Sequence, residues 1–331
     1  MMADQTRLSE TLDSISDPLS GGGLVTSRRA AAPRLSGNKA SVILDVTGLD
    51  ADTRQRLEGE VRERLLALEG VDEVRVALTA EKLERRIIAV GSGKGGVGKS
   101  TLTANLAVAL HRLGVKVGLV DADIYGPSLP RLMSAEGKRP VAIEKQLQPV
   151  ETEFGVPMLS MGQLVEPGRA LAWRGPMAGS ALGQLVDADW GAVELLLLDL
   201  PPGTGDVQLS MIQKHRPAGA VIVSTPQDLA LMDATRAIDL FRQAAVPVVG
   251  IVENMAGYVC PHCGESSDPF GTGGAQASAE ALDIPFLGRI PLDIGIRLAS
   301  DAGRPPAAAD GESPFEPVAR ALMDWLNKRN A

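Results

Sequence analysis

One stretch of the chain reads Gly93-Lys94-Gly95-Gly96-Val97-Gly98-Lys99-Ser100-Thr101. It matches the pattern G-x-x-x-x-G-K-[ST], with a strand-like apolar run before it and a helix-like segment after it. Glycines at these positions let several backbone N–H groups face one anion, and the N-terminus of the following helix adds the positive end of its dipole. In such a loop Lys99 neutralises the β- and γ-phosphates of a nucleotide, and the Ser100 hydroxyl is a ligand for Mg²⁺. We therefore expect an ATP site at Gly93–Thr101.

Apolar runs alternate with helical patterns from Ile87 onward, which is typical of βαβ units around a parallel sheet. The expected strands are 87–90, 115–120, 194–198, 220–224, 246–252 and 286–290. The expected helices are 98–113, 178–187, 229–244 and 315–328. Aromatic residues make up only 3% of the chain, which suits a sheet packed by small and branched side chains. The predicted fold class is α/β, a P-loop NTPase with a mostly parallel sheet flanked by helices.

Residues 1–80 are expected to form a separate, small α+β domain ahead of the nucleotide-binding domain. They contain a strand-like run at 41–46, an amphipathic segment at 53–68 and a further strand at 71–78. The charged segment 81–86 has no apolar face to bury, so it is interpreted as a linker. The ATPase domain then occupies residues 87–331.

Charge and hydropathy exclude several classes of partner. The formal net charge of −8 provides no overall attraction for a polyanion, so we expect no nucleic-acid partner. The N-terminal residues lack a basic-then-apolar signal pattern, and the longest strongly apolar run, Leu195–Leu198, is far too short to cross a membrane. The sequence is interpreted as that of a cytoplasmic protein without a membrane partner.

Acidic residues follow two of the expected strands directly. Asp121 and Asp123 come after the strand at 115–120, and Asp199 comes after the strand at 194–198. Because parallel strands end at the same edge of a sheet as the phosphate-binding loop, these carboxylates are expected near the phosphates. Carboxylates there hold Mg²⁺ and its waters or orient the attacking water. Asp199 is interpreted as the Walker B acid, and the alternative for all three is a helix-cap or turn role.

The only two cysteines of the chain, Cys260 and Cys263, stand in the sequence Cys260-Pro261-His262-Cys263. Two thiolates at this spacing can reach one metal ion or one edge of a cluster, but structural zinc and [4Fe–4S] clusters both take four ligands. The missing pair must then come from a second chain. The spacing alone leaves three alternatives, which are a thioredoxin-like redox pair, a structural zinc shared by two chains and a bridging iron–sulfur cluster.

Lys94 is the informative deviation, because an ordinary phosphate-binding loop needs no lysine at its second position. With this lysine the loop resembles the deviant Walker A family, which includes MinD, ParA, the nitrogenase iron protein and the Mrp/ApbC carriers. The resemblance implies a homodimer in which Lys94 reaches the phosphates bound by the partner subunit. It also implies that Lys94, Lys99, Asp123 and Asp199 are the catalytic residues.

The same resemblance suggests further roles. Asp123 is expected to position the attacking water, and Asp121 to bind Mg²⁺ or to support the loop, beside Ser100 and Asp199 as Mg²⁺ ligands. Asn254 matches the position whose side-chain amide contacts adenine in the family. Pro291 and Asp293 resemble the second base-contacting segment of the family, and they complete the expected nucleotide-binding residues.

Six further segments carry a closer resemblance. They are Val120–Ser128, Trp173–Met177, Asp199–Asp206, Ser224–Gln227, Glu253–Met255 and Cys260–Cys263. Together they resemble the Mrp/ApbC iron–sulfur cluster carriers over about residues 85–330. This resemblance implies an ATP-hydrolysing homodimer that binds a [4Fe–4S] cluster between two Cys260/Cys263 pairs and transfers it to apoproteins. The N-terminal domain resembles the iron–sulfur assembly domain fused to many such carriers, but it has no cysteine, so we expect it to dock targets instead.

Other functions are compatible with the nucleotide site. A positional ATPase of the MinD/ParA class would need a basic amphipathic tail, whereas the amphipathic segment Pro314–Arg329 carries mixed charges and suits a packed terminal helix. An electron donor like the nitrogenase iron protein has its cysteines far apart in sequence. An ATPase dimer bridged by structural zinc is the remaining alternative.

Overall fold

The computed structural model describes residues 5–80, 85–143, 146–164 and 175–329. The chain divides into two compact units, of which the first comprises residues 1–84 with 189–193, and the second comprises residues 85–188 and 194–331. Each unit has its own buried apolar core. Of the expected linker 81–86, residues 81–84 lie outside the described residues, and Arg86 already belongs to a strand of the second unit.

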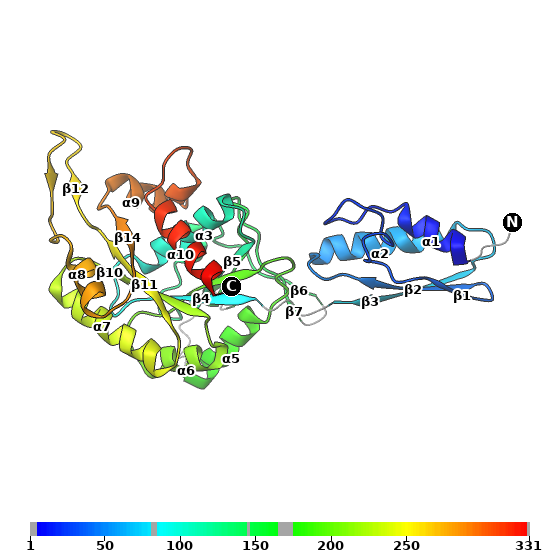
Figure 1. Cartoon of the computed structure of the whole chain (residues 1–331), viewed down its shortest axis with the longest axis horizontal. Helices are drawn as coiled ribbons and strands as arrows, with labels where there is room; N and C mark the ends of the chain where they lie inside the picture. Colours follow the sequence, from blue (N-terminus) through cyan, green and yellow to red (C-terminus); the bar gives the residue numbers. More distant parts are fainter. Residues whose placement is uncertain (1–4, 81–84, 144–145, 165–174, 330–331) are drawn as a thin grey trace. The chain divides into compact units, whose positions relative to one another are not determined.

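The first unit packs two helices against one face of a small sheet (Figure 1). Its elements are α1 (Gln5–Asp13), β1 (Arg34–Ser36), β2 (Lys39–Asp45), α2 (Ala51–Leu66) and β3 (Glu73–Thr79). β2 lies between β1, to which it is antiparallel, and β3, to which it is parallel. α2 begins where it does because the Asp50 side chain accepts a hydrogen bond from the backbone N–H of Thr53, at 2.8 Å. β2, α2 and β3 lie within a few residues of the predicted strand at 41–46, segment at 53–68 and strand at 71–78.

The second unit is built on a seven-stranded sheet in the order β14-β11-β10-β4-β9-β5-β8. All its described strand pairs are parallel. The strands are β4 (Arg86–Gly91), β5 (Val117–Asp121), β8 (Met158–Ser160), β9 (Leu195–Asp199), β10 (Gly219–Ser224), β11 (Val248–Asn254) and β14 (Phe286–Ile290). β9 consists of four leucines and an aspartate, all buried, as expected for a central strand covered on both faces. The predicted fold class is confirmed.

Helices cover both faces of this sheet, with α3 and α10 on one side and α5, α6 and α7 on the other (Figure 1). The helices are α3 (Lys99–Arg112), α4 (Leu129–Leu132), α5 (Gly175–Val186), α6 (Asp206–His215), α7 (Asp228–Gln243), α8 (Gly274–Ala281), α9 (Ile294–Asp301) and α10 (Glu316–Lys328). Short 3₁₀ turns occupy Met161–Gln163 and Pro306–Ala308. No helix among the described residues is both long and apolar enough to cross a membrane.

Two small antiparallel ribbons stand apart from the main sheet. One pairs β6 (Ala142–Ile143) with β7 (Gln146–Leu147), and the other pairs β12 (Tyr258–Val259) with β13 (Ser266–Ser267). The β12–β13 hairpin projects from the body of the second unit (Figure 1). It carries the two cysteines at its turn, so the fold presents them on an extended arm.

Phe241 tests the packing of α7 on the sheet. It is fully buried, and a Cβ atom added at Gly91 of β4 would lie 2.9 Å from its ring, so the glycine provides the space that the ring occupies. We expect Phe241→Ala to lower the free energy of unfolding by about 3–5 kcal/mol, through lost burial and a cavity. Leu298→Ala, at a position 53% exposed, should change it by about 0.5 kcal/mol or less. Urea unfolding measures both, and equal losses would contradict this packing.

Candidate nucleotide site and cysteine hairpin

The phosphate-binding loop connects β4 to the N-terminus of α3, as the sequence predicts. Gly96 and Gly98 have positive φ values of 81° and 83°, a conformation that residues with a Cβ atom rarely adopt. Space is also restricted, because a Cβ atom on Gly98 would lie 2.1 Å from the side-chain nitrogen of Asn254. A Cβ atom on Gly93 would lie equally close to the backbone of Asp233. The glycines are therefore required by the fold of the loop as well as by a phosphate.

Lys99 and Asp199 form a buried ion pair at the centre of the site. The Lys99 Nζ atom lies 2.8 Å from Oδ2 of Asp199, and the two side chains are 6% and 0% exposed. The Ser100 hydroxyl donates to the same carboxylate oxygen at 2.6 Å, and the Thr103 hydroxyl donates to Oδ1 at 2.8 Å. The first turn of α3 is thus joined to the end of β9 through one carboxylate.

Asp121 lies beside Asp199, because β5 and β9 are parallel neighbours in which these residues are in register. Its carboxylate accepts hydrogen bonds from the backbone N–H groups of Asp123 and Leu129 and from the Ser160 hydroxyl. Burial, followed by the charge of Asp199, raises the pKa of Asp121 from its ordinary value of 3.8 to about 8, although Lys99 acts in the opposite direction. Asp121 therefore also organises the loop that follows β5.

Asp123 lies in that loop, where its carboxylate accepts from the backbone N–H groups of Tyr125 and Gly126 at 3.1 and 3.2 Å. It faces a cavity of about 250 Å³. The residues that line this cavity are Ser92, Lys94, Gly95, Gly96, Val97, Gly98, Lys99, Ser100, Thr101, Asp123, Ser128, Leu132 and Pro202. The structure thus gathers the phosphate-binding loop and Asp123 around one space, with Asp121 and Asp199 beneath it.

Lys94 differs from Lys99 in forming no ion pair with any residue that the structure describes. Its side chain lines the cavity and is half-buried, and among the described residues its ammonium group has no partner. Its backbone carbonyl accepts a hydrogen bond from the Ser92 hydroxyl at 2.9 Å, which fixes the start of the loop. The cation is therefore available to a ligand or to another chain.

The three residues expected to contact the base have different surroundings. Asn254 is buried at the end of β11, and its side-chain nitrogen donates to the carbonyl of Val97 at 2.8 Å. Asp293 caps α9 by accepting from the backbone N–H of Ile296, and neither it nor Pro291 is among the described residues that line the cavity. The structure therefore brings Asn254 to the phosphate-binding loop, and the adenine contacts of all three stay predictions.

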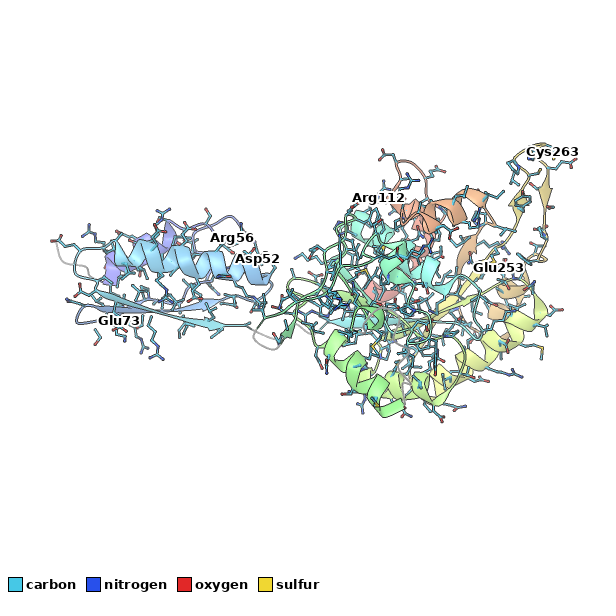
Figure 2. The ribbon with its side chains drawn as sticks, turned by 180° about the vertical axis from the view of Figure 1, so that it is seen from behind. Asp52, Arg56, Glu73, Arg112, Glu253 and Cys263 are labelled. Atoms are coloured by element: carbon cyan, nitrogen blue, oxygen red, sulfur yellow. The ribbon has the colours of Figure 1, made fainter. Side chains whose placement is uncertain are left out.

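The cysteine pair lies at the turn of the β12–β13 hairpin, and Figure 2 shows Cys263 at its tip. The turn is closed by hydrogen bonds of 2.9 Å from the backbone N–H of Cys260 to the carbonyl of Glu265, and from that of Gly264 to the carbonyl of Cys260. Backbone N–H groups of Cys263 and His262 lower the pKa of the Cys260 thiol, and the Cys263 side chain contributes in the same direction. The described residues contain no group of three or more potential metal ligands, so the role of the pair as cluster ligands stays a prediction.

Sequence reasoning missed two hydroxyls that hold the buried carboxylates. Thr103 lies one turn after Lys99 on α3, a spacing that would have indicated the same helix face. Ser160 belongs to β8, a three-residue strand whose pattern is too short to recognise. Of the segment Trp173–Met177, the first two residues lie outside the described residues, and the rest begin α5.

A glycine loop between a parallel strand and a helix, with a buried lysine and an acid on a neighbouring strand, defines a P-loop NTPase. The model of the ParA family described as NUBPL iron-transfer P-loop NTPase matches residues 84–327. The chain belongs to this family.

Two similar proteins cover much of the chain. An iron-sulfur cluster carrier protein of Deinococcus radiodurans is 44% identical over 330 residues, which span 96% of this chain and 93% of that protein. A protein of Arabidopsis thaliana named as an iron-sulfur protein required for NADH dehydrogenase, mitochondrial, is 49% identical over 240 residues, which span 72% of this chain and 75% of that protein. The first similarity therefore extends over the N-terminal unit.

Solved structures agree with the fold. A nucleotide-binding protein of Archaeoglobus fulgidus in complex with ADP has a TM-score of 0.61 and 42% identity, and the match covers 70% of this chain and 90% of that one. The cell division protein MinD of Aquifex aeolicus has a TM-score of 0.54 at 23% identity, covering 72% and 97% of the two chains. The second similarity shows the fold alone.

The buried carboxyl of Asp121 predicts a pH dependence of stability. Between about pH 4 and pH 8 the folded chain keeps a proton on Asp121 that the unfolded chain has released, so stability should fall as pH rises through this window. Asp121→Asn should remove a slope of about one proton. Urea unfolding at several pH values, without nucleotide or Mg²⁺, measures this slope. The exposed variant Asp310→Asn should keep the wild-type profile, and a wild-type profile in Asp121→Asn would contradict the assignment.

Proposed function

We propose that this chain is an ATP-binding and ATP-hydrolysing carrier of iron–sulfur clusters. It acts as a homodimer, holds a [4Fe–4S] cluster between the Cys260/Cys263 pairs of two subunits and transfers the cluster to apoproteins. The observation that carries the proposal is a pair of free cysteines, Cys260 half-buried and Cys263 exposed, on an arm of the same domain that contains the phosphate-binding loop. The name of the Deinococcus relative, iron-sulfur cluster carrier protein, supports it.

The nucleotide site has the parts that phosphoryl transfer requires. Lys99 supplies a buried cation for the phosphates, and Asp123 borders the cavity where it can orient the attacking water. The Ser100 hydroxyl and the Asp199 carboxylate lie 2.6 Å apart and offer the oxygen ligands that Mg²⁺ prefers. Mg²⁺ bound there would neutralise phosphate charge. Asp121 holds this arrangement from beneath through its bonds to the backbone of its own loop.

Three features support a homodimer. The Lys94 cation borders the cavity without a partner among the described residues, and two thiols satisfy half of a four-ligand site. Exposed apolar side chains also surround the loop, since Tyr125 follows Asp123 and is 72% exposed. Leu229 and Met232, which are 71% and 58% exposed, lie on the turn of α7 that packs against Gly93. A second copy would cover these side chains and complete both sites.

The thiols suit the cargo. The thiolate is the form that binds iron, and backbone N–H groups lower the pKa of Cys260 toward that form. Cys263 is exposed at the tip of an arm, where a recipient protein can approach a bound cluster. The N-terminal domain, residues 1–80, contains no cysteine, and we assign it to docking of targets.

Loss of one thiol should abolish cluster binding. After anaerobic reconstitution with iron and sulfide, wild type should show the charge-transfer absorbance of an iron–sulfur cluster, and Cys260→Ser should lose it because a two-thiol half-site then has one ligand. His262→Ala, between the cysteines, should retain it, since both thiols of the half-site remain. Undiminished absorbance in Cys260→Ser would refute the cluster site, and zinc without iron would favour the structural-zinc alternative.

A mixing experiment tests whether Lys94 acts across the dimer. Lys94→Ala and Asp123→Asn should each lower ATP turnover by about a hundredfold, because each removes charge stabilisation or water positioning. In a mixture of the two, a heterodimer regains one intact site, so turnover should recover to about a quarter of wild type. Lys116→Ala, an exposed lysine outside the site, is the control. No recovery on mixing, with heterodimers demonstrated, would show that Lys94 acts within its own subunit.

A further inference from the structure

The cysteine arm comprises residues 255–273, which connect the end of β11 to the start of α8. Glu253, the penultimate residue of β11, is 0% exposed, and its carboxylate accepts hydrogen bonds from α8 and from β14. Its Oε1 atom accepts from the backbone N–H of Ala275 in α8 at 2.9 Å, and its Oε2 atom accepts from Nε of Arg289 at 2.8 Å. One carboxylate therefore holds the C-terminal end of the arm against β11, from which the arm starts. Figure 2 places Glu253 near the base of the arm.

Further contacts stiffen the same base. Arg289 lies beside Glu253 in the parallel register of β11 and β14, and its Nη2 atom donates to the Gln276 side chain at 2.7 Å. The N-terminal end of the arm is bonded to the end of β14, because the N–H of Ala256 donates to the carbonyl of Ile290 at 3.0 Å. The N–H of Leu292 donates in turn to the carbonyl of Gly257 at 2.9 Å. Both ends of the arm are thus fixed to the sheet edge.

The base of the arm also touches the nucleotide site. Asn254 follows Glu253 directly, and its amide donates to the carbonyl of Val97 in the phosphate-binding loop. The first turns of α7 form a second connection. A Cβ atom on Gly274 would lie 2.7 Å from the Leu231 side chain, and one on Gly93 would lie 2.1 Å from the Asp233 backbone, so α7 packs against both glycines. A movement of the phosphate-binding loop on nucleotide binding can therefore reach the N-terminal end of the arm through Asn254. It can reach the C-terminal end of the arm through α7.

A buried carboxylate at the end of a strand is costly to desolvate, and a structural role alone could be filled by an apolar side chain. We propose that Glu253 is a positioning residue for the Cys260/Cys263 pair. It fixes the arm to the end of β11, where Asn254 is bonded to the phosphate-binding loop, and nucleotide occupancy thereby changes the exposure of the thiols. The inference rests on the proposed function, because it names how the nucleotide site regulates the thiol site.

Thiol alkylation provides a direct test, because Cys260 and Cys263 are the only cysteines and every modified thiol reports on the arm. The full-length, reduced, cluster-free protein is treated with N-ethylmaleimide, with and without Mg²⁺ and a non-hydrolysable ATP analogue, and modification is followed by mass spectrometry. Nucleotide should slow alkylation of wild type at least about fivefold, the lower end of ordinary coupling between sites. In Arg289→Ala alkylation should be faster without nucleotide, and the response to nucleotide should be lost.

Two further variants separate positioning from general stability. Arg289→Lys keeps a cation beside Glu253 and should restore most of the response, whereas Arg320→Ala, which removes an exposed ion pair with Glu316 on α10, should behave as wild type. Glu253→Gln replaces Arg289→Ala in the test if Arg289→Ala does not fold. It keeps an acceptor for the Ala275 N–H and loses the ion pair, so its response to nucleotide should also be lost. A wild-type response in Arg289→Ala, or no response in wild type, would overturn the proposal. Because the assay uses neither iron nor sulfide, its outcome is independent of whether the cluster is bound.

Discussion

The ion pair between Lys99 and Asp199 is the interaction on which the nucleotide site depends. It joins the first turn of α3 to the end of β9 inside the protein, where water cannot screen it, and Ser100 and Thr103 complete the hydrogen bonds of the carboxylate. A second carboxylate, Asp121, lies next to it in the sheet. The charge of Lys99 balances that of Asp199, and the raised pKa of Asp121 keeps its carboxyl neutral below about pH 8.

The sheet topology explains why one domain can contain two kinds of site. β4, β9 and β5 end at the phosphate-binding loop and its acids, while β10, β11 and β14 extend the same edge toward the cysteine arm. The last residues of β11 serve both sites, with Asn254 bonded to the phosphate-binding loop and Glu253 to the base of the arm. The end of β11 therefore connects the phosphate-binding loop to the arm directly, and coupling through it requires no large rearrangement of the domain.

Much of this arrangement follows from the sequence because its signals are local. The glycine loop and the leucine run before Asp199 each indicate their chemistry within about ten residues, whereas the C-x-x-C spacing alone leaves its chemistry open. The short elements were not predicted, since β8 and the helices α6, α8 and α9 are too brief or too polar to show a period. The contacts of Glu253 also escape sequence reasoning, because Ala275 and Arg289 come from distant segments that only the sheet register brings together.

The proposed cluster site requires two chains, each of which supplies one Cys260/Cys263 pair. Native mass spectrometry of the anaerobically reconstituted protein measures the number of chains and the mass of bound iron and sulfide in the same particle. We expect particles of two chains that carry a single [4Fe–4S] cluster. A cluster bound to one chain alone, or a dimer that binds neither iron nor sulfide, would contradict it.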